Sequence, residues 1–239
     1  MSIDTAAIKQ LFQSQDVEAI QKGLDSIAQA EASYAEAPPA EQEQILRLQI
    51  MLQSRKLAVQ QATGASAEDL VETYRNTATL WMRSGETEKA MGQLQKALEM
   101  KENDLESLQI LARAQLNMSK YEDSIATQEK AIAALEPDAA VNADPLAQAY
   151  VQLANIYEAK GDFEQAIEIL KKAEKLDDQL ADLVQAEIQG KLGVICEKVG
   201  RDEEAVTALT KAHALYLQQK GEEYYKTQEM AYLLEMASS

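Results

Sequence analysis

The stretch LANIYEAKGDFEQAIEILKKAEKL, residues 153–176, decides the fold. It contains two helical patterns of apolar residues, separated by a break around Gly161. Glycine readily adopts the left-handed backbone conformation that ends many helices, and Asp162 can cap the helix that follows. The stretch therefore predicts two helices joined by a tight turn.

Small residues stand on both sides of this turn, with Ala154 before it and Ala166 and Ala173 after it. Helix axes pack about 8–10 Å apart, and small side chains permit the near end of that range. We expect Ala154 and Ala166 to let the two helices touch, and Ala173 to admit the first helix of the next pair. Ala147 precedes these core sites, so Ala147→Leu is expected to cost far less stability than Ala154→Leu. Because one pair cannot bury its apolar side alone, such pairs must stack.

The same pattern recurs in four copies along the chain. The turn position is occupied by Gly85, Ser119, Gly161 and Gly200. The position five residues later is occupied by Ala90, Ser124, Ala166 and Ala205, and the position twelve residues later by Ala97, Ala131, Ala173 and Ala212. Seven residues before the turn stand Ala78, Ala112, Ala154 and Gly193. Three aligned columns of small residues indicate a true repeat.

This succession resembles the tetratricopeptide repeat, a unit of 34 residues that carries small residues, a Tyr and a Gly at these positions. The best copy, 147–180, matches at Ala154, Tyr157, Gly161, Phe163, Ala166 and Ala173. The resemblance implies an all-α superhelix, a right-handed solenoid of antiparallel helix pairs. We expect four pairs within residues 67–221, at 71–104, 105–138, 147–180 and 186–219.

The copy at 105–138 departs most from the pattern. Ser119 and Ser124 stand where Gly and Ala are usual, and Gln115 and Gln128 occupy sites that are normally apolar. We therefore expect this pair to pack least well.

An insertion at 136–144 separates the second copy from the third. Longer units of this sort are similar to those of motor-protein light chains and cell-polarity adaptors. At its end, Asp144 is expected to cap the next helix, with Pro145 in the first turn.

The segment before the repeats, residues 1–66, is predicted to form helices near 3–13, 17–36 and 41–62. Asp16 can cap the second helix, and Ser66 with Asp69 forms a capping pair for the first repeat. The third helix is apolar on more than one side, so we expect it to pack on both the N-terminal pair and the first repeat. Self-association of the chain through residues 1–62 is the alternative.

Residues 222–239 are predicted to form the C-terminal cap of the stack, because a repeat array needs one. The amphipathic pattern there directs Tyr225, Met230, Leu233 and Leu234 towards the last repeat.

The net charge of −17 at pH 7 limits the classes of partner. Such a balance repels phosphate backbones and anionic membranes, so neither nucleic acid nor a membrane surface is expected. No apolar run reaches the roughly 18 residues that a membrane span needs, and the N-terminus shows no secretory pattern. Cys196 is the single cysteine, which fits a reducing compartment. These features predict a cytoplasmic protein.

No motif for catalysis is found in the sequence. His213 lacks a second histidine or an adjacent nucleophile, and Cys196 and Trp81 occupy a core position of the repeat. No phosphate-binding glycine loop occurs, and one Cys with one His cannot form a Cys/His metal site. We expect no enzyme activity, no cofactor and no metal.

The family resemblance implies that the first helix of each pair lines a groove for a partner peptide or helix. The residues predicted to face this groove lie three, six, ten and thirteen positions before the turns, with Arg83 beside them. Those singled out are Arg75, Thr79, Met82, Arg83, Gln109, Arg113, Gln148, Val151, Asn155 and Glu158. We call them the groove residues. Their mixed character suits selective recognition, and predicts a non-catalytic adaptor or assembly factor.

Chaperone-binding members of the family use a clamp of Lys, Asn, Asn, Lys and Arg. Here the corresponding positions hold Arg75, Thr79, Ile110, Gln148 and Gln152. We therefore expect a partner other than the C-terminal tail of a chaperone.

Two groove arginines, Arg75 and Arg113, could bind an acidic part of the partner segment. The C-terminal half of the chain is acidic, so we expect it to bind a basic or apolar part of the same segment. The alternative is that these arginines pair with the nearby Glu72 and Glu106.

Overall fold

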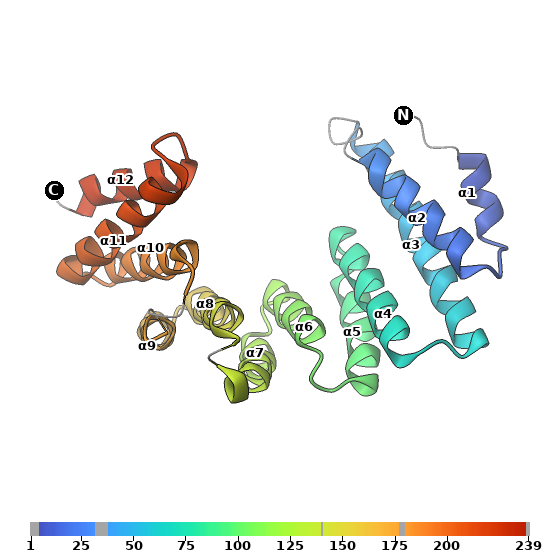
Figure 1. Ribbon diagram of the computed structural model, residues 1–239, viewed down its shortest axis with the longest axis horizontal. Helices are drawn as coiled ribbons and strands as arrows, with labels where there is room; N and C mark the ends of the chain where they lie inside the picture. The colour runs from blue at the N-terminus through green and yellow to red at the C-terminus, as the bar shows by residue number, and fades with distance from the viewer. Residues whose placement is uncertain (1–4, 32–37, 140, 177–179, 238–239) are drawn as a thin grey trace. The chain divides into compact units, whose positions relative to one another are not determined.

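The structure, a computed structural model, describes residues 5–31, 38–139, 141–176 and 180–237. These residues form helices joined by short turns and contain no strand, so the predicted all-α class is confirmed (Figure 1). The helices are α1 (Thr5–Leu11), α2 (Val17–Glu31), α3 (Pro39–Thr63), α4 (Ala67–Arg83), α5 (Thr87–Met100), α6 (Leu105–Asn117), α7 (Tyr121–Leu135), η2 (Glu136–Asp138), α8 (Ala143–Lys160), α9 (Phe163–Glu174), α10 (Asp182–Lys198), α11 (Asp202–Lys220) and α12 (Tyr225–Ala237).

The chain divides into two compact units, Met1–Ser119 and Lys120–Ser239. We call them unit 1, which contains α1 to α6, and unit 2, which contains α7 to α12. The division falls in the turn at Ser119, inside the range 105–138 whose sequence departs most from the repeat. Within unit 1, α4 and α5 form a packed pair, and within unit 2, α8 with α9 and α10 with α11 do the same.

The four turn positions share one backbone conformation. Gly85, Gly161 and Gly200 have φ of 80°, 89° and 74°, and Ser119 has φ of 56°. Ser119 is the single residue other than glycine with positive φ among the described residues. The left-handed turn predicted at Gly161 is therefore confirmed, and Ser119 has a positive φ as well, although it is not a glycine.

The columns of small residues allow the close helix packing that was predicted. Ala78, Ala112 and Ala154 are buried, and so are the alanines that follow the turns. At Gly193, an added Cβ would lie 2.6 Å from Leu209 Cγ and 3.2 Å from the Ala205 carbonyl oxygen. The premise for Ala147 was wrong, because this residue is as fully buried as Ala154.

Most of the predicted helix caps are present. The Asp16 carboxylate accepts from Glu18 N at 2.9 Å, Ser66 Oγ accepts from Asp69 N at 3.1 Å, and Asp162 accepts from Gln165 N at 3.4 Å. The predicted cap at Asp144 was wrong. Helix α8 begins one residue earlier, at Ala143, so Asp144 lies inside its first turn and accepts a hydrogen bond from Ala181 N at 3.0 Å.

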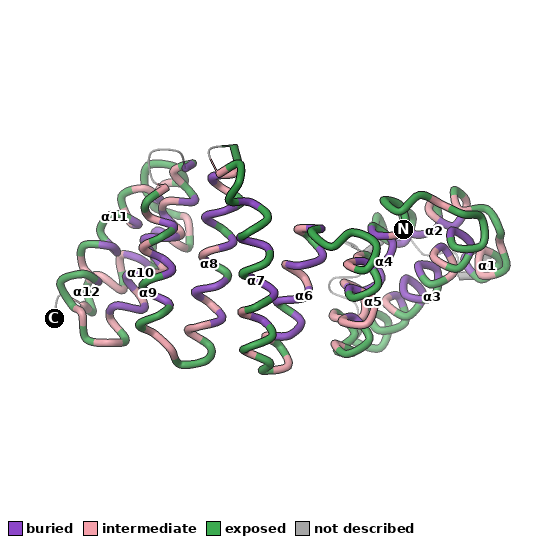
Figure 2. The backbone as a smooth tube through the Cα atoms, turned by 90° about the horizontal axis from the view of Figure 1, so that it is seen from below, coloured by how far each residue is buried: buried purple, intermediate pink, exposed green. Residues whose placement is uncertain are grey.

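Helix α3 is buried on two sides, as its sequence predicted. Leu48, Leu52 and Val59 belong to a core with α1 and α2, whereas Leu57 packs against the core of α4 and α5. Figure 2 shows buried positions along the length of α3. The expected extension of the second helix over 32–36 lies outside the described residues. Helix α3 therefore continues the repeat packing towards the N-terminus of unit 1.

Helix α12 covers the C-terminal end of unit 2. Met230 is buried against Ala212 and Tyr216 of α11, with Leu233 and Leu234 packed around it, as predicted. Tyr225 was expected to face the last repeat as well, but it is exposed. The inward side of α12 passes through Thr227, Met230 and Leu234, so Tyr225 lies on the opposite side.

Candidate functional site

Arg75 is the first groove residue of unit 1, and its guanidinium is occupied within the protein. Nη1 lies 2.9 Å from Asp104 Oδ2, and Nη2 lies 3.0 Å from Glu106 Oε2. Asp104 precedes α6, and Glu106 lies in its first turn. Arg75 therefore ties α4 to α6, and of the two predicted acidic partners it is Glu106 that contacts it.

Asp104 is buried, with 6% of its side chain exposed, and serves three donors. Its carboxylate accepts from Ser107 N, Ser107 Oγ and Arg75 Nη1 at 3.1, 2.7 and 2.9 Å. Burial raises the pKa of this carboxyl, but the hydrogen bonds from Ser107 and Arg75 and the charge of Arg75 together hold the pKa below its ordinary value. The folded protein therefore favours the ionised form of Asp104 beside Arg75.

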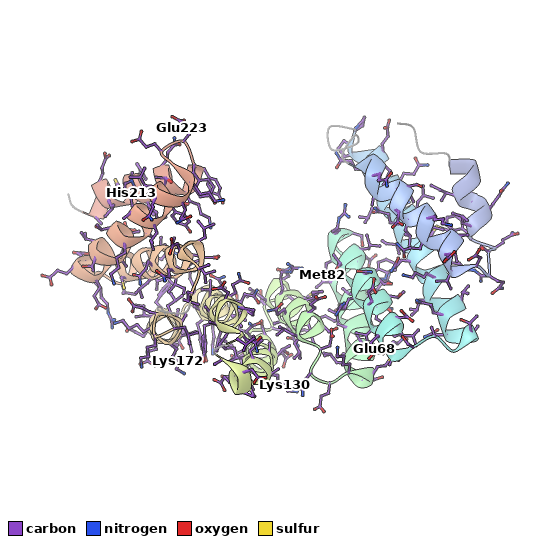
Figure 3. All side chains as sticks on the ribbon, in the orientation of Figure 1. Glu68, Met82, Lys130, Lys172, His213 and Glu223 are labelled. Atoms are coloured by element: carbon purple, nitrogen blue, oxygen red, sulfur yellow. The ribbon has the colours of Figure 1, made fainter. Side chains whose placement is uncertain are left out.

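The remaining groove residues on α4 are used in different ways. The Thr79 hydroxyl donates to the Arg75 carbonyl of its own helix at 3.1 Å. Met82, labelled in Figure 3, is half-buried against the core formed by Ala78 and Leu94. A partner could reach the exposed parts of these two side chains.

Arg113 differs from Arg75 because it is exposed and makes no hydrogen bond or ion pair with any described residue. Gln109, one turn earlier on α6, is half-buried. A forked cationic donor and an amide therefore lie on one side of α6, where a carboxylate could accept from both.

Arg83 lines a cleft of unit 1 that the groove prediction did not contain. The cleft has a volume of about 720 Å³ and lies between the first half of α3 and the end of α4. Its apolar lining includes Leu46, Ile50, Met51 and Trp81, and 53% of Met51 is exposed. Trp81 is thus partly a core residue, as predicted, and partly a wall of this cleft.

In unit 2, Glu158 repeats the role of Arg75 with the charges reversed. Its carboxylate binds Lys191 Nζ at 3.3 Å and also binds Lys198, and both lysines lie on α10. Burial raises the pKa of Glu158, but the hydrogen bonds and charges of Lys198 and Lys191 together lower the pKa below its ordinary value. Glu158 therefore joins α8 to α10.

The other three groove residues of unit 2 differ in their exposure. Gln148 is exposed, whereas Val151 is buried and acts as a packing residue. Asn155 is half-buried, and its Oδ1 is buried without a hydrogen-bond partner among the described residues. Only Gln148 of these three presents its side chain freely to solvent.

The residues considered for chemistry have ordinary surroundings. Cys196 is fully buried, and burial, followed by the charge of Glu204, raises the pKa of its thiol. His213 lies half-buried on α11. Within the described ranges, no group of three or more His, Cys, Asp or Glu side chains could hold a metal ion. None of the helices in those ranges is long and apolar enough to cross a membrane.

The sequence pointed to Glu106 as a partner of Arg75, but not to Asp104 or to the two lysines that bind Glu158. Asp104 carries the signal of a helix cap, because Ser107 follows three residues later, but no local pattern links it to Arg75. Lys191 and Lys198 lie 33 and 40 residues after Glu158, so only the register of neighbouring repeats could bring them together. The cleft beside α3 could be inferred from Leu46 and Ile50, which lie away from the main apolar side of that helix.

A family model described as tetratricopeptide repeat matches residues 104–179 and 145–218. No curated protein matches the chain.

Several solved structures share the fold. A putative kinesin light chain from Podosopora anserina with nearly identical TPR-like repeats is 17% identical, and the match covers 81% of this chain and 98% of that one, with a TM-score of 0.64. BtubC (BKLC) from P. vanneervenii is 16% identical over 91% and 94% of the two chains, with a TM-score of 0.64. MamA is 22% identical over 77% and 95%, with a TM-score of 0.57. At these identities the likeness concerns the fold.

Proposed function

Because the chain belongs to the tetratricopeptide-repeat family, we propose that it is a non-catalytic adaptor or assembly factor that holds a peptide or helix of another protein. The observation that supports this most is Arg113, an exposed guanidinium without a partner in an acidic protein. Arginine offers forked donors that match a carboxylate. The partner segment would therefore be acidic where it meets α6.

The groove residues would have two different roles: some would contact the partner, and others would position the helices. Arg113, Gln109 and the exposed part of Met82 would contact the partner in unit 1, since their side chains are at least partly accessible. Arg75 and Glu158 would instead position the first helices, because their charges are already paired. In unit 2, Gln148 would be the accessible contact.

Charge reversal at Arg113 tests this proposal. Arg113→Glu should leave the helix content unchanged and weaken recovery of bound proteins from native cell extract, more strongly at low salt. Lys96→Glu, on the exposed side of α5, is the matched control and should bind as the wild type does. Equal recovery with both variants would contradict a role for this side of α6.

A second candidate function is self-association through residues 1–62, which the exposed Met51 in the cleft beside α3 favours. Met51→Lys would then convert an oligomer to a monomer in light scattering. A monomeric wild-type protein would exclude this candidate.

We also propose a cytoplasmic location. The support is the single cysteine, Cys196, which lies in the core and takes no part in a disulfide. Localisation of a fluorescent fusion tests this.

A further inference from the structure

Helix α12 carries a line of exposed apolar side chains on its outer side. Tyr225, Tyr232 and Met236 are 63%, 62% and 56% exposed. Their spacing of seven and four residues places them on one narrow stripe of the helix. We call these three residues the outer stripe.

The opposite side of α12 already has its apolar contacts. Met230 and Thr227 are buried there, and Leu233 and Leu234 pack around Met230. A surface helix normally presents charged and polar residues on the side away from the core. Helix α12 departs from this rule, because it presents large apolar residues on both sides.

Tyr225 is held in position by other aromatic rings. The rings of Tyr224 and Tyr225 meet edge to face with centroids 4.9 Å apart, and Tyr224 lies 5.8 Å from the buried Tyr216. This chain of contacts connects the outer stripe to the core of unit 2. A rigid aromatic residue loses little conformational freedom on binding, which is why tyrosine is common at the centre of interfaces.

Unpaired carboxylates border the outer stripe. Glu222, Glu223 and Glu229 are exposed, and none of them forms a hydrogen bond or ion pair with a described residue. Glu229 lies one turn after Tyr225 and three residues before Tyr232, so it interrupts the stripe with a negative charge. Glu223, labelled in Figure 3, lies in the turn that leads into α12.

A small cleft lies beside Glu229 and has room for a side chain. Its volume is about 210 Å³, and Met230, Val194 and Glu187 also line it. Its two lysines are occupied, because Lys191 binds Glu158 and Lys226 lies 5.5 Å from the centre of the Tyr216 ring. Glu187 interacts with the charge of Lys226, so Glu229 is the carboxylate of this cleft that is left for an incoming cation.

We propose that the outer stripe is a docking surface for a basic amphipathic helix of another protein. Apolar residues of that helix would cover Tyr225, Tyr232 and Met236, and a lysine or arginine would meet Glu229. A second copy of α12 fits poorly, because it would bring the acidic borders of two chains together without cations to neutralise them. None of the groove residues belongs to the outer stripe, so either proposal can fail alone.

A labelled 18-residue helical peptide of leucine and lysine, with its leucines along one side, is the probe. Its affinity for the full chain is measured by fluorescence anisotropy. The double variant Tyr232→Ser/Met236→Ser should bind it roughly tenfold or more weakly than the wild type. The matched control, Met100→Ser/Val141→Ser, removes exposed apolar side chains elsewhere and should leave the affinity unchanged.

Two further measurements separate this docking mode from other causes. Glu229→Gln should weaken binding several-fold and flatten its dependence on salt, without any change to the apolar residues. A scrambled peptide of the same composition should bind poorly. Equal affinity of the wild type and the stripe variant would overturn the proposal, and so would equal binding of the scrambled peptide. A wild-type dimer that the stripe variant dissociates would also overturn it, since a second copy would then cover the stripe.

Discussion

The Arg75 guanidinium lies 2.9 Å from the Asp104 carboxylate, and this ion pair joins the first helices of two successive repeats in unit 1. Unit 2 contains a corresponding ion pair in which the first helix carries the negative charge: Glu158 on α8 binds Lys191 and Lys198 on α10. In both units, a charged residue predicted to face a ligand instead connects neighbouring helices. This separates the groove residues into those that hold the repeats together and those left for a partner.

Removal of Arg75 should therefore destabilise unit 1. Arg75→Met leaves the buried Asp104 carboxylate with the longer, solvent-exposed contact to Lys101 at 3.4 Å, so we expect a loss of about 1–3 kcal/mol. Arg47→Met removes an exposed ion pair with Glu43, at 2.6 Å, and should cost less than about 0.5 kcal/mol. Urea unfolding followed by circular dichroism measures both. If the two variants lose the same stability, the Arg75–Asp104 pair has no special role.

The pH dependence of stability should reflect the lowered pKa of Asp104. A carboxyl whose folded pKa is depressed stabilises the fold above its unfolded pKa, about 3.9, and this contribution disappears as the pH falls through the folded value. The wild type should thus be more stable than Asp104→Asn at pH 7, and the difference should shrink below about pH 4. A difference that stays constant down to pH 2 would show that the charge of Asp104 is irrelevant.

Replacement of glycine by alanine within a helix usually stabilises a protein. At Gly193, close packing should make the same replacement destabilising. The added Cβ would meet Leu209 Cγ at 2.6 Å, so Gly193→Ala should cost about 1–3 kcal/mol. Gly92 has no atom within 4 Å of such a Cβ, and Gly92→Ala should stabilise the protein by about 0.5–1 kcal/mol. Opposite shifts of the unfolding midpoint are expected. Stabilisation by both changes would disprove the tight approach of α10 and α11.

Ser119→Gly should stabilise the protein, because the repeat position of Ser119 favours glycine. Its φ of 56° costs a residue with a Cβ about 1–2 kcal/mol, and part of this is recovered in Ser119→Gly. We expect a net stabilisation of about 0.5–1 kcal/mol, after the entropy cost of glycine in the unfolded chain. Ser84→Gly, at φ −81°, has no such strain to relieve and should be slightly destabilising. Thermal unfolding of the two variants compares them directly.

The sequence predicted those features that depend on local conformation or on the repeat. The left-handed conformation of Gly161 followed from the glycine itself, whereas the positive φ of Ser119 was not predicted, because serine gives no such signal. The burial of Ala154 and Ala166 followed from the column of small residues. The cap at Asp16 depends on residues two and three positions away, and local patterns suffice for it.

The errors arose where a distant contact decided the outcome. Asp144 looked like a helix cap, but its carboxylate accepts from Ala181 N, 37 residues away. Tyr225 fitted an amphipathic pattern, yet the inward side of α12 is set by the packing of Met230 on α10 and α11. For Arg75 the sequence left ligand binding and ion pairing open. The structure pairs it with Glu106, as one alternative predicted, and also with Asp104, which no local pattern indicated. A periodic pattern identifies the apolar side of a helix. It does not identify which side chain of a neighbouring helix or turn will contact that side.

The most direct test of the proposed function is photo-crosslinking from the groove side of α6. A benzophenone amino acid replaces Gln109 in one variant and Lys96, on α5, in another, and each is irradiated in native cell extract. We predict that a protein is crosslinked at position 109 and not at position 96, because the partner lies along the first helices of the repeats. A crosslink at position 96 with none at position 109 would contradict this account.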